Sequence, residues 1–354
     1  HRDLHSFPTR RSSHLLSWWI MFKVVRLFPY EGGIATEQKV LDGIAEVVER
    51  PCYSEDDVIA NAKDADAVIA CYEKITPRVM DALPNLKLAA YKSIGFNNID
   101  LDYATVIGLP VTHIATYCIK EVADYVTLAI LNASRRFVHF HDAVIKDKEW
   151  RWDLFLDIRR FECETVGLYG FGNIPRLVAE RLQPFGCKIL AYDPYIDQSL
   201  GDKYRVELVS SEDELMARSD YLSIQLNLNP QTSKMFNKER FSKMKDGAVF
   251  INSARGGLVD ESDLIDALDS GKLNFAILDV LTDEYPNPDI HPLINHKKVI
   301  TTPHIAFYSR EAAEQGKADA ARNVRRFFEG DFEHMELVNK VERSEEHTSE
   351  LQSR

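Results

Sequence analysis

Three segments of the chain place reactive side chains directly after runs typical of buried strands. Arg255 lies in INSARGGLVDE, Glu284 in LDVLTDEYP and His304 in TTPHIAFYS. The carboxyl ends of parallel strands form the edge at which ligands bind in open α/β sheets. A guanidinium can hold a carboxylate through two hydrogen bonds, and a histidine can exchange a proton near neutral pH. The three residues therefore favour a site that binds a small 2-keto acid, with Arg255 gripping the carboxylate, His304 donating a proton and Glu284 fixing the imidazole.

Each of these residues also has an ordinary structural interpretation when taken singly. Arg255 could be a surface arginine at a strand end, Glu284 a solvated carboxylate in an acidic loop, and His304 a buried histidine with its hydrogen bonds satisfied. The occurrence of all three at strand ends favours the chemical interpretation, because ligand sites collect there.

A glycine turn lies between an expected strand and an expected helix, in Gly170-Phe171-Gly172-Asn173-Ile174-Pro175. The first glycine permits a tight turn, and the second lets the backbone approach a pyrophosphate at the helix N-terminus. Pro175 replaces the third glycine of the usual pattern. Asp193 ends the next strand about 20 residues later, where an acid binds ribose hydroxyls and repels the extra phosphate of NADP. The turn predicts NAD as the cofactor, with phosphate contacts from the N–H groups of Asn173 and Ile174.

The composition excludes several other classes of function. The formal net charge of the 354 residues is −12, which disfavours nucleic-acid binding. No apolar run approaches the roughly 20 residues of a membrane helix, so no membrane partner is expected. The cysteines and histidines show no metal spacing, so no metal site is expected. The five cysteines are scattered, which favours a reducing cytoplasm over a disulfide framework.

The order of strands and helices predicts an α/β protein with two doubly wound parallel sheets. Apolar runs alternate with helical stretches in both halves of the chain, and the segment 121–150 has helical periodicity over many turns. A last helix is expected from about Arg310 to Phe328. Residues 1–20 and 341–354 lack such a pattern and are expected to be non-native extensions.

The chain resembles the D-isomer-specific 2-hydroxyacid dehydrogenase family over about residues 22–330. The resemblance rests on five stretches in a characteristic order: IGFNNIDL, the glycine turn with AYDP, INSARGGLVDE, LDVLTDE and TPHIAFYS. It implies a flavodoxin-like substrate domain (21–119 plus 305–340) and a Rossmann NAD domain (120–304), with the active site in the cleft between them. It also implies that the helix in 121–150 forms a homodimer.

The resemblance also implies the identity of the site residues. The catalytic set of the family falls on Arg255, Glu284 and His304, and the loop that holds the substrate carboxylate falls on Ser93, Ile94 and Gly95. The implied cofactor site comprises Gly170, Gly172, Asn173, Ile174, Asp193, Leu226, Asn227, Ser253, Ala254 and Asp279.

Departures from the family pattern leave two alternatives open. Asn227 and Asp193-Pro194-Tyr195 resemble the C-terminal-binding-protein branch, whose animal members are corepressors, whereas Phe307-Tyr308 resembles D-lactate dehydrogenases. One alternative is therefore a dimeric scaffold that senses NAD(H). A second, based on Pro175, is an inactive dehydrogenase that only binds NAD. The absence of a basic cluster in the first domain disfavours a phosphorylated substrate such as 3-phosphoglycerate.

Overall fold

The computed structural model describes residues 21–29 and 32–341. Contacts between residues divide the chain into two units. Unit 2 comprises Lys92–Asn97 and His113–Asp319, and unit 1 comprises the described residues outside those ranges. The proposed non-native extensions lie outside the described residues, apart from Val341.

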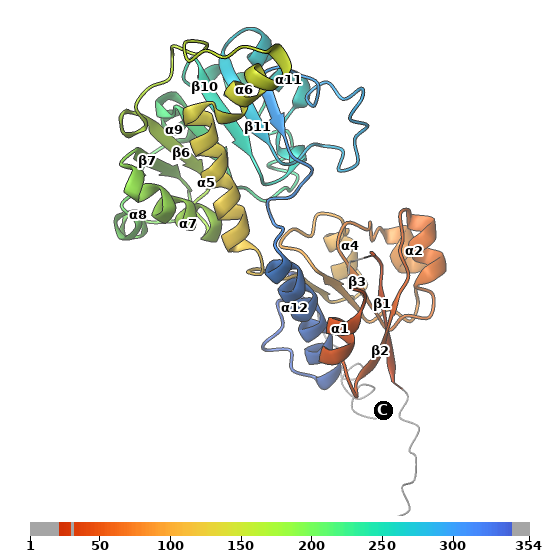
Figure 1. Cartoon of the computed structure of the whole chain (residues 1–354). Coiled ribbons are helices and arrows are strands. Elements are labelled where there is room, and N and C mark those ends of the chain that lie inside the picture. The colour runs from red at the N-terminus through yellow and green to blue at the C-terminus, as the bar shows by residue number, and fades with distance from the viewer. Residues whose placement is uncertain (1–20, 30–31, 342–354) are drawn as a thin grey trace, which may run out of the picture. The chain divides into compact units, whose positions relative to one another are not determined.

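Unit 1 is built on a five-stranded parallel sheet with the strand order β2-β1-β3-β4-β5. This is the flavodoxin-like order expected from the sequence. Strands β3 and β4 are buried at every position, as in parallel sheets covered on both faces. The strands are β1 (Phe22–Arg26), β2 (Ala45–Glu49), β3 (Ala67–Ala70), β4 (Leu88–Tyr91) and β5 (Val111–Thr112), and the helices between them are α1 (Ala35–Val40), α2 (Glu55–Asn61), α3 (Pro77–Asp81) and α4 (Leu101–Val106) (Figure 1).

Unit 2 is built on a seven-stranded parallel sheet with the order β12-β11-β10-β9-β6-β7-β8. Counted from β6 as the first strand, this is the Rossmann order, and the direction of winding reverses between β6 and β9. The two parallel sheets confirm the predicted fold class. The strands are β6 (Thr165–Tyr169), β7 (Lys188–Tyr192), β8 (Glu207–Leu208), β9 (Tyr221–Ile224), β10 (Ala248–Asn252), β11 (Leu273–Leu278) and β12 (Val299–Thr301).

Helices cover both faces of this sheet, because successive side chains of each strand point to opposite faces. In β10, Val249 and Ile251 join a core with α5 and α7, whereas Ala248 and Phe250 join a second core with α9, α10 and α11 (Figure 1). The helices from Ile119 onward are α5 (Ile119–Arg135), α6 (Phe137–Asp142), α7 (Asn173–Leu182), α8 (Gln198–Tyr204), α9 (Glu212–Arg218), α10 (Lys238–Lys243), α11 (Glu261–Asp269) and α12 (Arg310–Glu329), of which α12 continues from unit 2 into unit 1. A π-helical turn lies at Ala143–Asp147, and 3₁₀ turns lie at Phe161–Cys163, Gln183–Phe185 and Gly256–Leu258.

The expectation of one helix over 121–150 is wrong. Helix α5 ends at Arg135, the next residue Arg136 has a left-handed backbone (φ 51°), and α6 begins after it. The Arg136 side chain is buried, with its guanidinium 5.0 Å from the Phe155 ring centroid and 5.2 Å from that of Phe275, and it is ion-paired with Asp157. These contacts come from residues distant in sequence, so the helical periodicity of the segment does not reveal the break.

The last helix agrees with the expectation. Helix α12 ends at Glu329, directly before Gly330, which has a positive φ of 78°. Among the described residues, no helix is both long and apolar enough to cross a membrane.

Candidate active site

The three predicted catalytic segments leave the same edge of the seven-stranded sheet. Strands β10, β11 and β12 are neighbours, and their pairing sets Asn252 beside Leu278, and Leu278 beside Thr301. These are the last residues of the three strands, so the segments that carry Arg255 and His304 begin side by side. The structure therefore brings these segments together within unit 2, as their positions at strand ends predict.

His304 and Glu284 form a hydrogen-bonded pair. The imidazole Nδ1 lies 2.7 Å from the Glu284 Oε2, and the side chains are 18% and 30% exposed. A carboxylate only accepts hydrogen bonds, so Nδ1 carries the proton that is shared with Glu284. The Phe307 ring packs edge-on against the imidazole, with ring centroids 5.8 Å apart. The pair fixes the tautomer and the orientation of the imidazole.

Asp279 holds the turn that carries His304. Its buried carboxylate accepts hydrogen bonds from the Thr302 hydroxyl (2.6 Å) and from the backbone N–H groups of Ile305 (2.9 Å) and Ala306 (2.8 Å). Its backbone carbonyl accepts from the His304 N–H at 2.8 Å. Burial raises the pKa of Asp279, although these hydrogen bonds act in the opposite direction. The predicted contact of Asp279 with the cofactor stays a prediction.

The backbone of His304 is left-handed, with φ 52°. This conformation is uncommon for a residue other than glycine, and it occurs where surrounding contacts enforce it, often at functional sites. Two hydroxyls also help to hold this turn. The Tyr125 hydroxyl lies 2.5 Å from the Thr302 hydroxyl, which in turn donates a hydrogen bond to Asp279.

The predicted carboxylate loop lies against Arg255. A Cβ atom on Gly95 would lie 1.8 Å from Arg255 Nη2, so the guanidinium packs where only glycine leaves room. The Ser93 hydroxyl donates to the Gly95 carbonyl at 2.6 Å, and His113 Nδ1 lies 2.9 Å from the Ile94 carbonyl oxygen. The loop and Arg255 belong to the same unit, so the structure joins these two predicted substrate-binding features.

The glycine turn follows β6 at the point where the winding of the sheet reverses. Gly170 has φ +88°, and a Cβ there would lie 2.6 Å from the Gln225 carbonyl oxygen. Asp193 Oδ2 accepts from the Phe171 N–H at 2.9 Å, so the acid at the end of β7 also stabilises the turn. Pro175 is buried in the first turn of α7, where its missing N–H costs no intrahelical hydrogen bond.

The turn fits the pyrophosphate of a dinucleotide. Gly172 is the N-cap of α7 and has no side chain that could cover the helix end. The space around its Cβ position is open, because no described atom other than those of its chain neighbours lies within 4 Å. The first backbone N–H groups of the helix, from Asn173 and Ile174, are thus available to an anion.

The remaining predicted cofactor residues lie around the ends of β6, β9 and β10. Leu226 Cδ2 is 3.4 Å from the Cβ position of Gly170, and Asn227 is exposed. The hydroxyl of Ser253 accepts from the Gln225 amide at 3.0 Å, and the Ala254 N–H donates to Asn252 Oδ1 at 3.0 Å. Their contact with a cofactor stays a prediction.

Sequence reasoning missed two residues that position Arg255. Asn97 accepts a hydrogen bond from Arg255 Nε at 3.1 Å, and Asn252 donates its side-chain amide to the Arg255 carbonyl at 2.9 Å. Both lie inside the recognised motifs, so their proximity to Gly95 and Arg255 is the signal that could have identified them.

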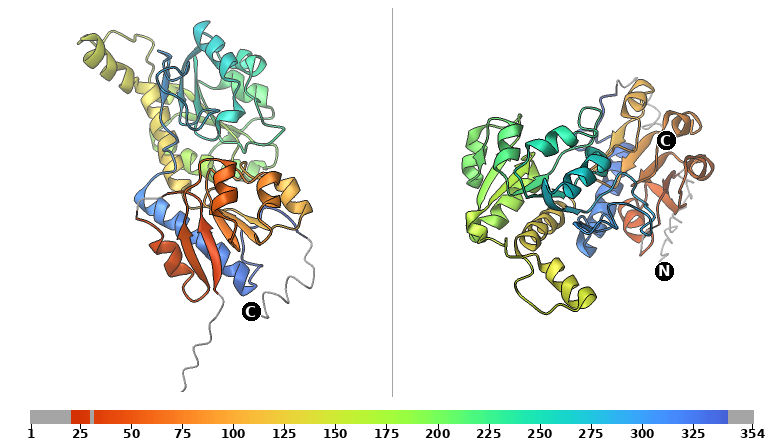
Figure 2. Two further views of the ribbon diagram at one scale, coloured as in Figure 1. Left: turned by 90° about the vertical axis from the view of Figure 1, so that its right-hand side faces the viewer. Right: turned by 90° about the horizontal axis from the view of Figure 1, so that it is seen from above.

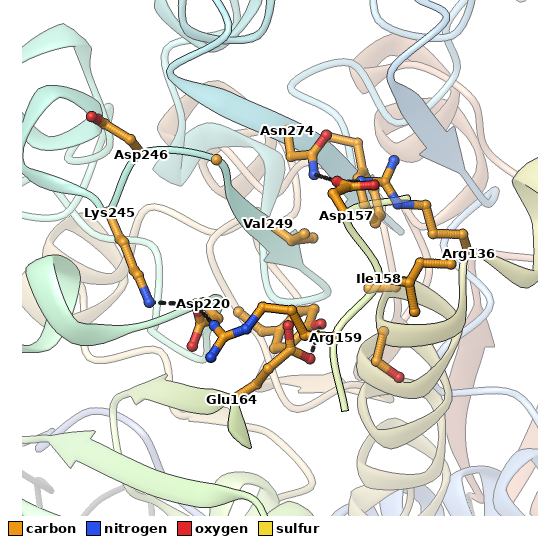
Figure 3. Close-up of a pocket in the computed structure, with 15 residues that line it drawn as sticks. Arg136, Asp157, Ile158, Arg159, Glu164, Asp220, Lys245, Asp246, Val249 and Asn274 are labelled. Carbon is orange, nitrogen blue, oxygen red and sulfur yellow. Dashed lines mark hydrogen bonds and ion pairs between the residues drawn. The ribbon is translucent and has the colours of Figure 1, made fainter. Parts of the chain in front are cut away.

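A cavity of about 280 Å³ in the described part of the chain is a separate feature. It is lined by Glu164, Asp220 and Gly247, which directly precede β6, β9 and β10, so it lies at the edge of the sheet opposite the site described above. Figure 3 shows Lys245 and Arg159 directed at Asp220, with nitrogen–oxygen distances of 2.5 and 3.7 Å. Its charges are mixed and largely paired with one another.

Comparisons with known proteins agree with this geometry. Residues 127–306 match the family model described as D-isomer specific 2-hydroxyacid dehydrogenase, NAD binding domain. A glyoxylate reductase from Thermofilum pendens is 35% identical over 327 residues, which are 90% of this chain and 94% of that protein. The crystal structure of D-lactate dehydrogenase from Aquifex aeolicus, complexed with NAD and lactic acid, matches with a TM-score of 0.79 and 31% identity over 91% of this chain and all of that one.

D-3-phosphoglycerate dehydrogenases are also similar. The protein from Mycobacterium bovis is 36% identical over 278 residues, or 78% of this chain and 52% of its own length. The chain thus spans about half the length of these relatives.

These matches show that the chain belongs to the D-isomer-specific 2-hydroxyacid dehydrogenase family. The matched segment is the NAD-binding domain of that family, so NAD is the cofactor, as the glycine turn predicts. The alternative of an NAD-sensing scaffold is not favoured, because the relatives named above are dehydrogenases and reductases.

Proposed function

We propose that the protein is an NAD-dependent D-2-hydroxyacid dehydrogenase, an oxidoreductase that reduces a small 2-keto acid with His304 as the proton donor. The observation that carries the proposal is the 2.7 Å bond between His304 and Glu284 on the edge of the sheet that also carries Arg255. Family membership supports it.

Each residue of the site has its own role in the proposed reaction. Arg255 and the loop Ser93–Gly95 bind the substrate carboxylate, and Arg255 also polarises the 2-keto group. NADH, when held at the glycine turn, would supply the hydride for carbon 2. His304 gives the proton on Nε2 to the carbonyl oxygen, and Glu284 stabilises the imidazolium before the transfer. The product is the 2-hydroxy acid, and the reverse reaction returns the same proton to His304.

We propose that Asp193 selects NAD over NADP. The carboxylate lies beside the glycine turn, where it would accept hydrogen bonds from ribose hydroxyls and repel a 2′-phosphate. We assign residues 120–304 to cofactor binding and residues 21–119 with 305–340 to substrate binding; the seven-stranded sheet and the glycine turn support the first assignment.

We also propose a homodimer in the cytoplasm. Helix α6 projects from the body of unit 2 in both views of Figure 2, although its His139 ring contacts Phe275 of β11, with ring centroids 4.8 Å apart. Phe137, Trp150, Trp152 and Leu156, on this helix and the segment after it, are more than 70% exposed, and exposed apolar groups of this kind mark interaction surfaces. Light scattering would test the dimer, and a monomer would count against it. The cysteines are free, which supports a reducing compartment.

The test of the activity is the consumption of NADH with a panel of 2-keto acids: pyruvate, glyoxylate, hydroxypyruvate, phenylpyruvate, 2-ketoisocaproate and phosphohydroxypyruvate. We expect turnover with at least one acid, and a loss of at least about 100-fold in kcat for His304→Ala. Asn237→Asp is a matched control, because aspartate replaces the N-cap of α10 with an equivalent acceptor. Binding of NADH without turnover of any acid would refute the proposal.

A further inference from the structure

Asn97 engages one edge of the Arg255 guanidinium. Arg255 donates its Nε–H to Asn97 Oδ1 at 3.1 Å and an Nη1–H to the Ala254 carbonyl at 2.7 Å. A guanidinium can hold a carboxylate through a side-on pair of donors, Nε and Nη2, or an end-on pair, Nη1 and Nη2. Nε carries a single N–H, so the bond to Asn97 closes the side-on pair to a bidentate carboxylate, whereas Nη1 keeps a second N–H beside the one that Ala254 accepts.

The Nη2 group is the donor turned toward the carboxylate loop. It lies 1.8 Å from the position that a Cβ of Gly95 would take, and the Arg255 Cζ and Nε lie 2.7 and 3.0 Å from it. The two N–H groups of Nη2 therefore lie beside the backbone of Gly95. We propose that Asn97 is a positioning residue, which directs Nη2 of Arg255 to the carboxylate subsite at Gly95 and prevents side-on binding. The proposal rests on the proposed function, because the ligand is the 2-keto acid.

The chemical type of residue 97 matters as much as its position. The amide of Asn97 accepts the Nε–H without adding a charge, so Arg255 keeps its full positive charge for the substrate. An aspartate would accept the same hydrogen bond but would place a second carboxylate near the substrate. A leucine would have a similar size but would release Nε. Asn97 is exposed, so both substitutions are compatible with folding.

The experiment compares Asn97→Asp and Asn97→Leu with the wild-type protein. The readouts are kcat and KM for the preferred 2-keto acid, and the binding of oxamate, a carboxylate analogue of pyruvate, to the protein–NADH complex by fluorescence. For Asn97→Asp we expect KM and the oxamate Kd to rise about tenfold with kcat nearly unchanged, the effect of a like charge about 6 Å away at an effective dielectric constant of roughly 40.

For Asn97→Leu we expect a different pattern. The released guanidinium can bind the carboxylate side-on, so kcat falls about tenfold while the oxamate Kd changes less than about threefold. The Kd of NADH stays unchanged in both variants, because the glycine turn is intact. Asn237→Asp, which adds the same charge on α10, is the control and leaves KM unchanged.

The outcomes separate this inference from the proposed function. Wild-type values of KM, kcat and oxamate Kd in both Asn97 variants would overturn the positioning role while the dehydrogenase proposal stands. An equal loss of NADH binding in both variants would indicate a general structural role and would also overturn it. A wild-type protein that neither turns over a 2-keto acid nor binds oxamate would overturn both proposals.

Discussion

The substitution Gly95→Ala tests the carboxylate site most directly. The added Cβ would lie 1.8 Å from Arg255 Nη2, whereas non-bonded heavy atoms rest about 3.5 Å apart. The guanidinium must therefore withdraw by about 1.5 Å or more. The φ angle of Gly95 is not positive, so its backbone accepts an alanine without strain.

The size of the effect follows from this displacement. A misplacement of about 1 Å in a group that orients the substrate can cost roughly 100-fold in rate. We therefore expect kcat/KM to fall by about 100-fold, or about 2.7 kcal/mol of transition-state stabilisation. The atoms that move are the end of a flexible side chain, so the free energy of unfolding should change by less than about 0.5 kcal/mol.

The assay is the NADH-dependent reduction of the preferred 2-keto acid by Gly95→Ala, Arg255→Ala and the double variant. Once Arg255 is truncated, the added methyl group no longer meets the guanidinium, so Gly95→Ala should cause little further loss in the double variant. The Kd of NADH should match that of the wild type throughout. A wild-type kcat/KM for Gly95→Ala, or losses that multiply in the double variant, would refute the reasoning.

Three further predictions concern acid–base chemistry, stability and cofactor choice. Glu284→Gln removes the charge beside the proposed proton donor, so kcat for reduction should fall about tenfold with an unchanged Kd for NADH; an unchanged kcat would contradict the role. Asp260→Ala should lower the free energy of unfolding by about 1 kcal/mol at neutral pH, because Asp260 caps α11. Hydrogen bonds from Ser262 and then Lys234 lower the pKa of Asp260 to about 2. A depressed folded-state pKa gives stability above the unfolded pKa of about 3.9 that is lost as pH falls, so urea midpoints of variant and wild type should converge between pH of about 4 and about 2. Asp193→Ala should raise kcat/KM with NADPH relative to NADH by about tenfold or more, since the repulsion of the 2′-phosphate is removed; an unchanged ratio would exclude this role for Asp193.

The fold was predictable where it depends on local apolar runs. Buried parallel strands such as β10 and β11 are nearly continuous apolar segments, so their number and class follow from the sequence. The break at Arg136 was not predictable, because the left-handed turn depends on packing against Phe275 and Asp157 from later parts of the chain. Helical periodicity continues through the break and carries no trace of those contacts.

The site was predictable where a residue follows a strand end. Arg255 and His304 both do so, and the pairing of β10, β11 and β12 brings their segments to one edge. For Asn97 the only signal was its place in a recognised motif beside Gly95, because an amide in a loop has no characteristic spacing and its partner Arg255 lies 158 residues later. Long-range hydrogen bonds of this kind become visible only when the fold is known.

The left-handed conformation of His304 explains why Asp279 is buried beside it. A residue with a side chain pays roughly 1–2 kcal/mol in this conformation, so other contacts must enforce it. Three donors converge on the Asp279 carboxylate, and two of them are backbone N–H groups of the residues that follow His304. The burial that raises the pKa of Asp279 also strengthens these hydrogen bonds, because the local dielectric is low. The carboxylate thus stabilises one backbone geometry of the turn, and this geometry directs the imidazole to Glu284. In this arrangement the cost of the strained backbone and of the buried charge is offset by one set of hydrogen bonds, which explains why a histidine rather than a glycine can occupy the turn.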